Sequence, residues 1–154
     1  MSTKSRNGLV AFVAIALGAP ALAIGAASAA TIVGAYYEDA GALTCNSTQC
    51  IVYFSNLPAG KNLIAQRVSC RIETSNPAAF SEMELTSKQS PQSNRFVPTW
   101  TATNGNFRYY LANADVLHLA TTQPFVRMKT MTGTVGQIYC TIGGELVPAE
   151  VPRL

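Results

Sequence analysis

Two glutamates separated by a single residue form the clearest carboxylate pair in this chain. Glu82 and Glu84 flank Met83 in a segment, 80–86, that is typical of a β-strand. Because side chains alternate along a strand, the two carboxylates project from one face with Cα atoms about 6.5–7 Å apart. Glycosidases use two carboxylates at a comparable spacing, one as acid and one as base or nucleophile. The pair permits glycan hydrolysis by Glu82 and Glu84, but it is more typical of a solvated strand face, so we predict no catalytic residue.

Other residues with catalytic chemistry are few. His118 is the only histidine, and no Gly-x-Ser-x-Gly sequence is present to expose a nucleophilic serine. Apolar residues occupy both faces of segment 116–120, so we expect His118 to be half-buried or at an edge, with a structural role. Among the four cysteines only Cys45 and Cys50 are close together, which is not the paired spacing of a zinc site. We therefore expect neither a metal nor a cofactor.

A predicted hairpin carries the aromatic candidates. Asn104-Gly105 favours a two-residue turn, because both residues tolerate a positive φ. The resulting register places one group of side chains on an apolar face: Trp100, Ala102, Phe107, Tyr109 and Leu111. Aromatic faces stack on sugar rings, but this register assigns most of the aromatic residues to the core. Tyr110 and Arg108 point the other way and are the exposed candidates for ligand binding.

The elements that would position these residues follow an N-terminal leader. Lys4 and Arg6 precede an apolar run without charges, 9–24, which is followed by small residues up to Ala30. This order is typical of a secretory signal peptide cleaved after residue 29 or 30. The alternative is an uncleaved anchor, since 9–30 is just long enough to cross a membrane. We predict a signal peptide over 1–30, a single domain over 31–154 and no membrane span in the mature chain.

Charge excludes one class of partner. Only 19 of the 154 residues are charged, and the formal net charge is +3. Without Lys4 and Arg6, nine basic residues remain against eight acidic ones, a net charge of +1. A nucleic-acid binder that releases counterions needs a basic surface. We therefore expect no nucleic-acid partner.

All four cysteines lie in the predicted mature chain, and an even number in an exported protein indicates two disulfides. Three pairings are possible. Cys45 and Cys50 flank a short polar turn, whereas Cys70 and Cys140 occupy matching positions within apolar strands. The predicted bridges are Cys45–Cys50 and Cys70–Cys140, the latter between the sheets or between neighbouring strands. Asn46-Ser47-Thr48 is a glycosylation sequon, relevant only in a eukaryotic secretory route.

Short strand-like segments recur at intervals of roughly ten residues, separated by turn residues. The nearly continuous apolar segment 50–55 predicts a central strand. Segment 62–74 alternates, with Ile64, Val68, Cys70 and Ile72 on one face. Gly143-Gly144 interrupts a strand that begins at 137 and resumes at 145. The pattern predicts an all-β fold of about eight strands: an antiparallel two-sheet sandwich of jelly-roll type, with a small barrel as the alternative.

Three stretches resemble small exported β-rich proteins of Gram-negative bacteria that have no known activity: 57–63 (LPAGKNL), 68–72 (VSCRI) and 140–146 (CTIGGEL). The resemblance implies a periplasmic or extracellular β-rich domain, and it transfers no functional residue. We expect a non-catalytic binding or structural module whose partner is a glycan or a protein at the cell envelope. The alternative is a small secreted glycan hydrolase.

Overall fold

The computed structural model describes residues 29–75, 78–89 and 92–149, which form strands and turns without any helix. Residues 1–28 of the predicted signal peptide therefore lie outside the described residues. The ten strands in the described ranges are β1 (Thr31–Val33), β2 (Tyr36–Ser47), β3 (Gln49–Tyr53), β4 (Lys61–Thr74), β5 (Ala79–Ser87), β6 (Asn94–Arg95), β7 (Thr99–Asn104), β8 (Phe107–Ala120), β9 (Pro124–Thr132) and β10 (Val135–Pro148).

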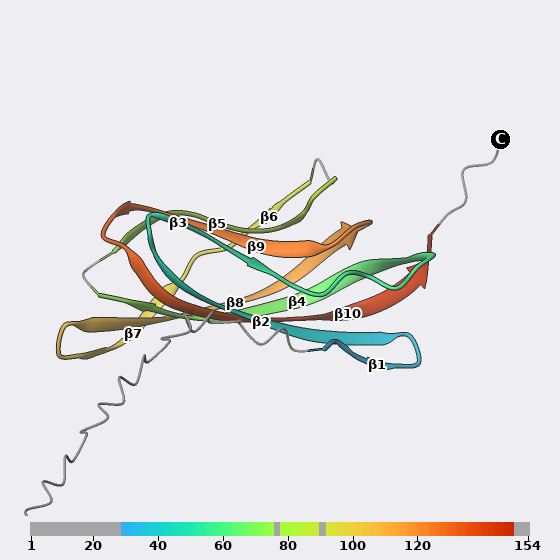
Figure 1. The fold of residues 1–154 in the computed structure, drawn as a ribbon, viewed down its shortest axis with the longest axis horizontal. Coiled ribbons are helices and arrows are strands. Elements are labelled where there is room, and N and C mark those ends of the chain that lie inside the picture. The colour runs from blue at the N-terminus through green and yellow to red at the C-terminus, as the bar shows by residue number, and fades with distance from the viewer. Residues whose placement is uncertain (1–28, 76–77, 90–91, 150–154) are drawn as a thin grey trace, which may run out of the picture.

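The strands form two antiparallel sheets that lie one above the other (Figure 1). The six-stranded sheet has the order β1-β2-β10-β4-β8-β7, and the four-stranded sheet has the order β3-β9-β5-β6. Early strands pair with late ones: β2 with β10, β3 with β9 and β4 with β8. The all-β, two-sheet prediction is thereby confirmed.

The core lies between the sheets and is built by period-two alternation. On β4 the side chains of Val68, Cys70 and Ile72 are buried, and the intervening Arg71 is exposed. A bulge between Ala65 and Arg67 changes the parity, so that Leu63 and Ala65 are buried in place of Ile64. The prediction that Ile64 shares the buried face was therefore wrong, because one extra residue reverses the direction of every side chain beyond it.

The buried side chains come from both sheets. Each large aliphatic side chain removed from water contributes about 1.5–3 kcal/mol, so this layer supplies the main driving force for folding. The largest fully buried apolar side chains are Tyr37, Leu63, Ile72, Met83, Leu85, Met128, Ile138 and Ile142.

Both predicted disulfides are present, and the described residues contain no free cysteine. Cys70 on β4 lies directly opposite Cys140 on β10, with 4.1 Å between their Cα atoms. This bridge therefore joins neighbouring strands of one sheet and does not cross between the sheets. Cys45 and Cys50 close the corner where the chain leaves β2 in one sheet and enters β3 in the other.

The hairpin exists, but its register differs from the prediction. Asn104 pairs with Phe107, so the two-residue turn is Gly105-Asn106. Gly105 has a φ of 58°, and no described non-glycine residue has a positive φ. A turn with positive φ only at its first central position has the pattern of type II′, whereas the prediction assumed positive φ at both central positions. The turn therefore lies one residue later than predicted.

Two further differences concern strand number and order. Segment 50–55 corresponds to β3, which lies at the edge of the four-stranded sheet and is not a central strand. β1 and β6, with three and two residues, are too short for a periodic pattern to reveal. β10 runs through Gly143-Gly144 as one strand with a bulge there, so the predicted interruption is only a shift in register. At Gly144 an added Cβ would lie 2.1 Å from the Ile64 carbonyl oxygen, so only glycine fits this approach.

Candidate functional site

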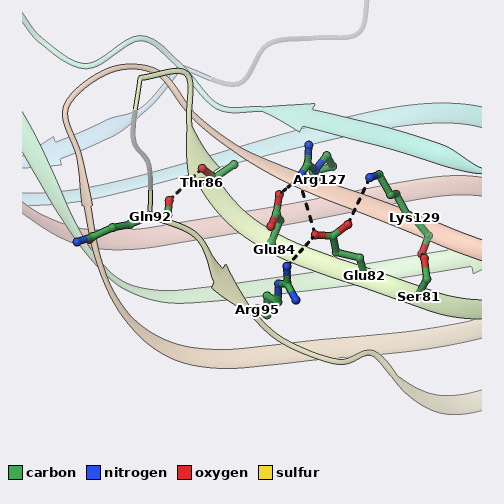
Figure 2. Close-up of polar contacts among 8 residues, drawn as sticks. All are labelled: Ser81, Glu82, Glu84, Thr86, Gln92, Arg95, Arg127 and Lys129. Carbon is green, nitrogen blue, oxygen red and sulfur yellow. Dashed lines mark hydrogen bonds and ion pairs between the residues drawn. The ribbon is translucent and has the colours of Figure 1, made fainter.

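The two glutamates predicted as a carboxylate pair lie on the outer face of the four-stranded sheet. Glu82 and Glu84 point outward on β5, while Met83 and Leu85 enter the core. Across the sheet, Lys129 pairs in register with Glu82, and Arg127 pairs with Glu84. Arg95, on the adjacent β6, completes a group of three cations and two carboxylates, which we call the charge cluster (Figure 2).

Every carboxylate of the charge cluster is ion-paired. Glu82 lies 3.4 Å from Lys129 Nζ, 3.6 Å from Arg95 Nη2 and 3.8 Å from Arg127 Nη2. Arg127 also contacts Glu84, whose side chain is only 4% exposed. Desolvation raises the pKa of Glu82, but the hydrogen bond from Lys129 and the charges of Lys129, Arg127 and Arg95 outweigh it and lower the pKa.

This geometry favours a structural role over hydrolysis. A glycosidase general acid must stay protonated near neutral pH, which requires a raised pKa. Glu82 has a lowered pKa, and Glu84 is covered and held by Arg127. Networks of this kind stabilise a sheet face modestly, and more than isolated surface pairs do.

His118 is more deeply buried than the sequence indicated. Its side chain points inward from β8, is 0% exposed and lies opposite Ala65 of β4. Neither ring nitrogen has a hydrogen-bond partner among the described residues. Burial lowers the pKa of His118, because the charged ring would lose its hydration. The residue is a neutral core side chain and has no nucleophile hydrogen-bonded to it.

The exposed aromatic candidate was wrongly placed. Tyr110 is 8% exposed and packs edge-to-face on Phe80 with 4.8 Å between ring centroids. Pairing with Ile72 of β4 directs Tyr110 inward, and Arg108 on the same side is half-buried. Trp100, expected in the core, is instead 58% exposed on the edge strand β7. Tyr110 and Arg108 therefore do not form an exposed stacking surface.

A hollow of about 610 Å³ lies on the outer face of the six-stranded sheet. It is built from outward-facing side chains of four neighbouring strands, which register places in two rows. The first row crosses Ala42, Tyr139, Arg71 and Leu111, and the second crosses Thr44, Gln137, Glu73 and Tyr109. We call this hollow the tyrosine hollow.

The tyrosine hollow combines aromatic surface with unused polar groups. Tyr139 is 48% exposed, and Tyr109 is half-buried. The side chains of Arg71, Glu73 and Gln137 make no hydrogen bond or ion pair with any described residue, in contrast to the charge cluster on the other sheet. Such polar groups beside aromatic surface are what a small polar ligand requires.

A second, polar hollow of about 460 Å³ continues along the same strands, and we call it the polar hollow. Ser69 Oγ donates a hydrogen bond to Asn113 Oδ1 at 2.6 Å. Arg67 Nη2 donates to the Tyr36 hydroxyl at 2.5 Å and lies 3.8 Å from Glu38. The remaining polar side chains of the polar hollow are Asp115 and Thr141.

One buried polar group was not foreseen from the sequence. Asp39 is buried on β2 and accepts hydrogen bonds from the Ser55 amide at 2.6 Å, the Ala40 amide at 2.8 Å and the Tyr37 hydroxyl at 3.2 Å. Burial, with the charge of Asp39, raises the pKa of Tyr37. Asp39 thus fastens β2 to the segment after β3. The sequence could have indicated this burial, because Asp39 is two residues after Tyr37 and therefore lies on the same, otherwise apolar, face of the strand.

The sequence did not identify the residues of the two hollows as a site either, since only strand pairing brings them together and no local motif marks them.

The described residues contain no cluster of three or more potential metal ligands and no helix long and apolar enough to cross a membrane. The two disulfides are typical of an oxidising environment outside the cytoplasm. No protein family, curated protein or solved structure was found to match this chain.

Proposed function

We propose that this chain is an exported, non-catalytic β-sandwich that binds a neutral glycan in the tyrosine hollow. The observation that carries the proposal is the contrast between the outer faces of the two sheets. Polar groups of the charge cluster satisfy one another, whereas Arg71, Glu73 and Gln137 have no partner among the described residues. They lie in the same hollow as Tyr109 and Tyr139 and are available to sugar hydroxyls.

Aromatic spacing fits a chain of sugar rings better than a single ring. Tyr139 and Tyr109 are two strands and two residues apart, which places their Cα atoms about 12 Å from each other. One sugar ring is too small to lie on both aromatic rings at once. The hollow volume, about 610 Å³, lies within the range of about 300–1,000 Å³ typical of small-ligand sites.

Charge favours a neutral glycan. The two hollows together contain two positive side chains, Arg67 and Arg71, and three negative ones: Glu38, Glu73 and Asp115. This surface has one more negative than positive charge, so it repels rather than attracts an acidic polysaccharide or a nucleic acid.

The proposed fold type and location are consistent with this role. The nested pairs β2–β10, β3–β9, β4–β8 and β5–β6 alternate between the two sheets, the order expected when one long antiparallel ribbon is wrapped into a jelly roll. Sugar-binding lectin domains are among the proteins built on that fold. The leader-like N-terminus and the two disulfides support export.

The test is a glycan array followed by calorimetry with the oligosaccharides that bind. We expect binding to neutral glycans and at least a tenfold loss with Tyr139→Ala. Trp100→Ala is the matched control, because Trp100 is an exposed aromatic residue outside the hollow. Binding restricted to acidic glycans, no binding to any glycan, or equal losses in the two variants would contradict the proposal.

A further inference from the structure

The tyrosine hollow and the polar hollow occupy successive rows of the same three central strands. On β10, Tyr139 lines the tyrosine hollow, and the next residue on the same strand face, Thr141, lines the polar hollow. On β8, Leu111 and Asn113 are related in the same way. On β4, Arg71 is followed by Ser69. Each step is two residues, the period of one strand face, so no strand or loop separates the two hollows.

We infer that a single extended glycan chain runs along the strands and occupies both hollows. The inference rests on the proposed function and adds the ligand's length and direction. From the row of Glu73 to the row of Arg67 there are six residues on β4, about 20 Å at the rise of a strand, which matches about four sugar rings in an extended chain. The ligand class is therefore an extended neutral oligosaccharide rather than a single terminal sugar.

The polar hollow is equipped for hydroxyl groups and not for stacking. The Ser69 hydroxyl binds Asn113 Oδ1, which leaves the amide nitrogen of Asn113 without a partner among the described residues. The Asp115 carboxylate is likewise unpaired within the described ranges. One side chain donates and the other accepts, which is the combination that a pair of sugar hydroxyls requires.

Arg67 is already held, so its role differs. Its guanidinium donates to Tyr36 and lies beside Glu38, whose own partner is also Tyr36. These contacts fix Arg67 at the far row of the polar hollow, opposite Asp115 on β8. Stacking at the tyrosine hollow then supplies most of the affinity, and hydrogen bonds at the polar hollow add affinity only for chains long enough to reach it.

The experiment is calorimetry on the full mature chain with β-1,4-linked glucose and N-acetylglucosamine oligomers of two to six rings. We expect affinity to rise about tenfold between two and four rings and then to level off, since two added hydrogen bonds contribute about that factor. The variant Asn113→Ala/Asp115→Ala should lose this gain for longer chains and leave binding of the two-ring sugar unchanged. Both side chains are exposed, so melting temperature should not change.

The outcomes separate the two proposals. Tyr139-dependent binding that is independent of length, or that Asn113→Ala/Asp115→Ala weakens equally at all lengths, overturns the extended chain and leaves the tyrosine hollow intact as a binding site. Absence of binding in both oligomer series and on the array overturns the proposed function itself. Thr44→Ala serves as the control, because Thr44 lines the tyrosine hollow in the row farthest from the polar hollow and should not alter the dependence on length.

Discussion

The two disulfides should contribute unequally to stability. Cys70 and Cys140 are separated by 70 residues in the chain, and Cys45 and Cys50 by five. The loop-closure relation gives about 4 kcal/mol for the long loop and about 2 kcal/mol for the short one. Cys70 and Cys140 are also fully buried, so that removing their sulfur atoms adds a small cavity cost of about 1 kcal/mol.

The assay is thermal unfolding, followed by circular dichroism, of two double variants, Cys70→Ala/Cys140→Ala and Cys45→Ala/Cys50→Ala. In a domain of this size, 1 kcal/mol shifts the melting temperature by about 4 °C. We therefore expect a fall of about 16–20 °C for the first variant and about 8 °C for the second. Alanine replaces both cysteines of each bridge, so neither variant leaves a free thiol to form a new bridge.

Equal losses in the two variants, or a larger loss for Cys45→Ala/Cys50→Ala, would refute this reasoning. Such a result would mean that the long loop is already compact in the unfolded chain, or that the corner between β2 and β3 is the critical constraint. Non-reducing peptide mapping is the direct check on the pairing itself. A peptide that links Cys50 to Cys70 would contradict the register of β4 with β10.

Three more predictions follow from burial and charge. The pKa of His118 in the folded protein is below its ordinary value of 6.5, so below pH 6.5 the unfolded chain binds more protons than the folded one. The free energy of unfolding should therefore be at its full value above pH 6.5 and fall as the pH drops toward the folded pKa. His118→Leu should flatten the dependence of the unfolding free energy on pH between pH 7.5 and 5.5. Tyr110→Ala should cost about 3–5 kcal/mol in urea unfolding, whereas Trp100→Ala should cost about 0.5 kcal/mol or less; the reverse order would contradict the observed faces of β7 and β8. Glu82→Gln should lower the melting temperature less than Tyr110→Ala does, and the loss should shrink in high salt; a loss unaffected by salt would argue against ion pairing.

The sequence predicted what depends on short-range periodicity. Val68, Cys70 and Ile72 alternate in the same way as Ile138, Cys140 and Ile142, so each cysteine was placed on a buried face. Two cysteines that both point into the core are more easily paired with each other than with Cys45 or Cys50, which flank a polar turn. For this reason the disulfides and the two-sheet sandwich could be derived without knowledge of strand order.

The hairpin shows where that reasoning fails. Asn104-Gly105 and Gly105-Asn106 are both plausible turns, and the choice between them depends on φ at a single residue. The predicted core face was chosen by aromatic content, but pairing of β8 with β4 directs Tyr110 inward. Trp100 stays exposed because it lies on the edge strand β7, every residue of which is exposed. The β7–β8 hairpin extends from one end of the six-stranded layer (Figure 1).

The candidate site could not be derived from the sequence, because it is a property of strand pairing. Tyr139 and Arg71 become neighbours only when β10 pairs with β4. The ion pairs of Glu82 depend in the same way on β9, more than forty residues further along the chain. The Glu82 and Glu84 carboxylates, which looked available for catalysis, are thus ion-paired, while Tyr139, which no motif marked, lies in the tyrosine hollow.

The Cys70–Cys140 disulfide and the proposed binding site lie on the same two strands, β4 and β10. Cys70 lies next to Arg71, and Cys140 lies next to Tyr139, with each cysteine pointing into the core and each neighbour pointing into the tyrosine hollow. The bridge between Cys70 and Cys140 therefore fixes the separation of the two strands directly beside the paired Arg71 and Tyr139, which line the proposed binding site. A preorganised surface loses less conformational freedom on binding than a flexible one, so more of each contact is retained as affinity. Placing the binding row on the outer side of a cross-linked, central strand pair gives a shallow, open hollow the rigidity that a deep pocket obtains from its walls.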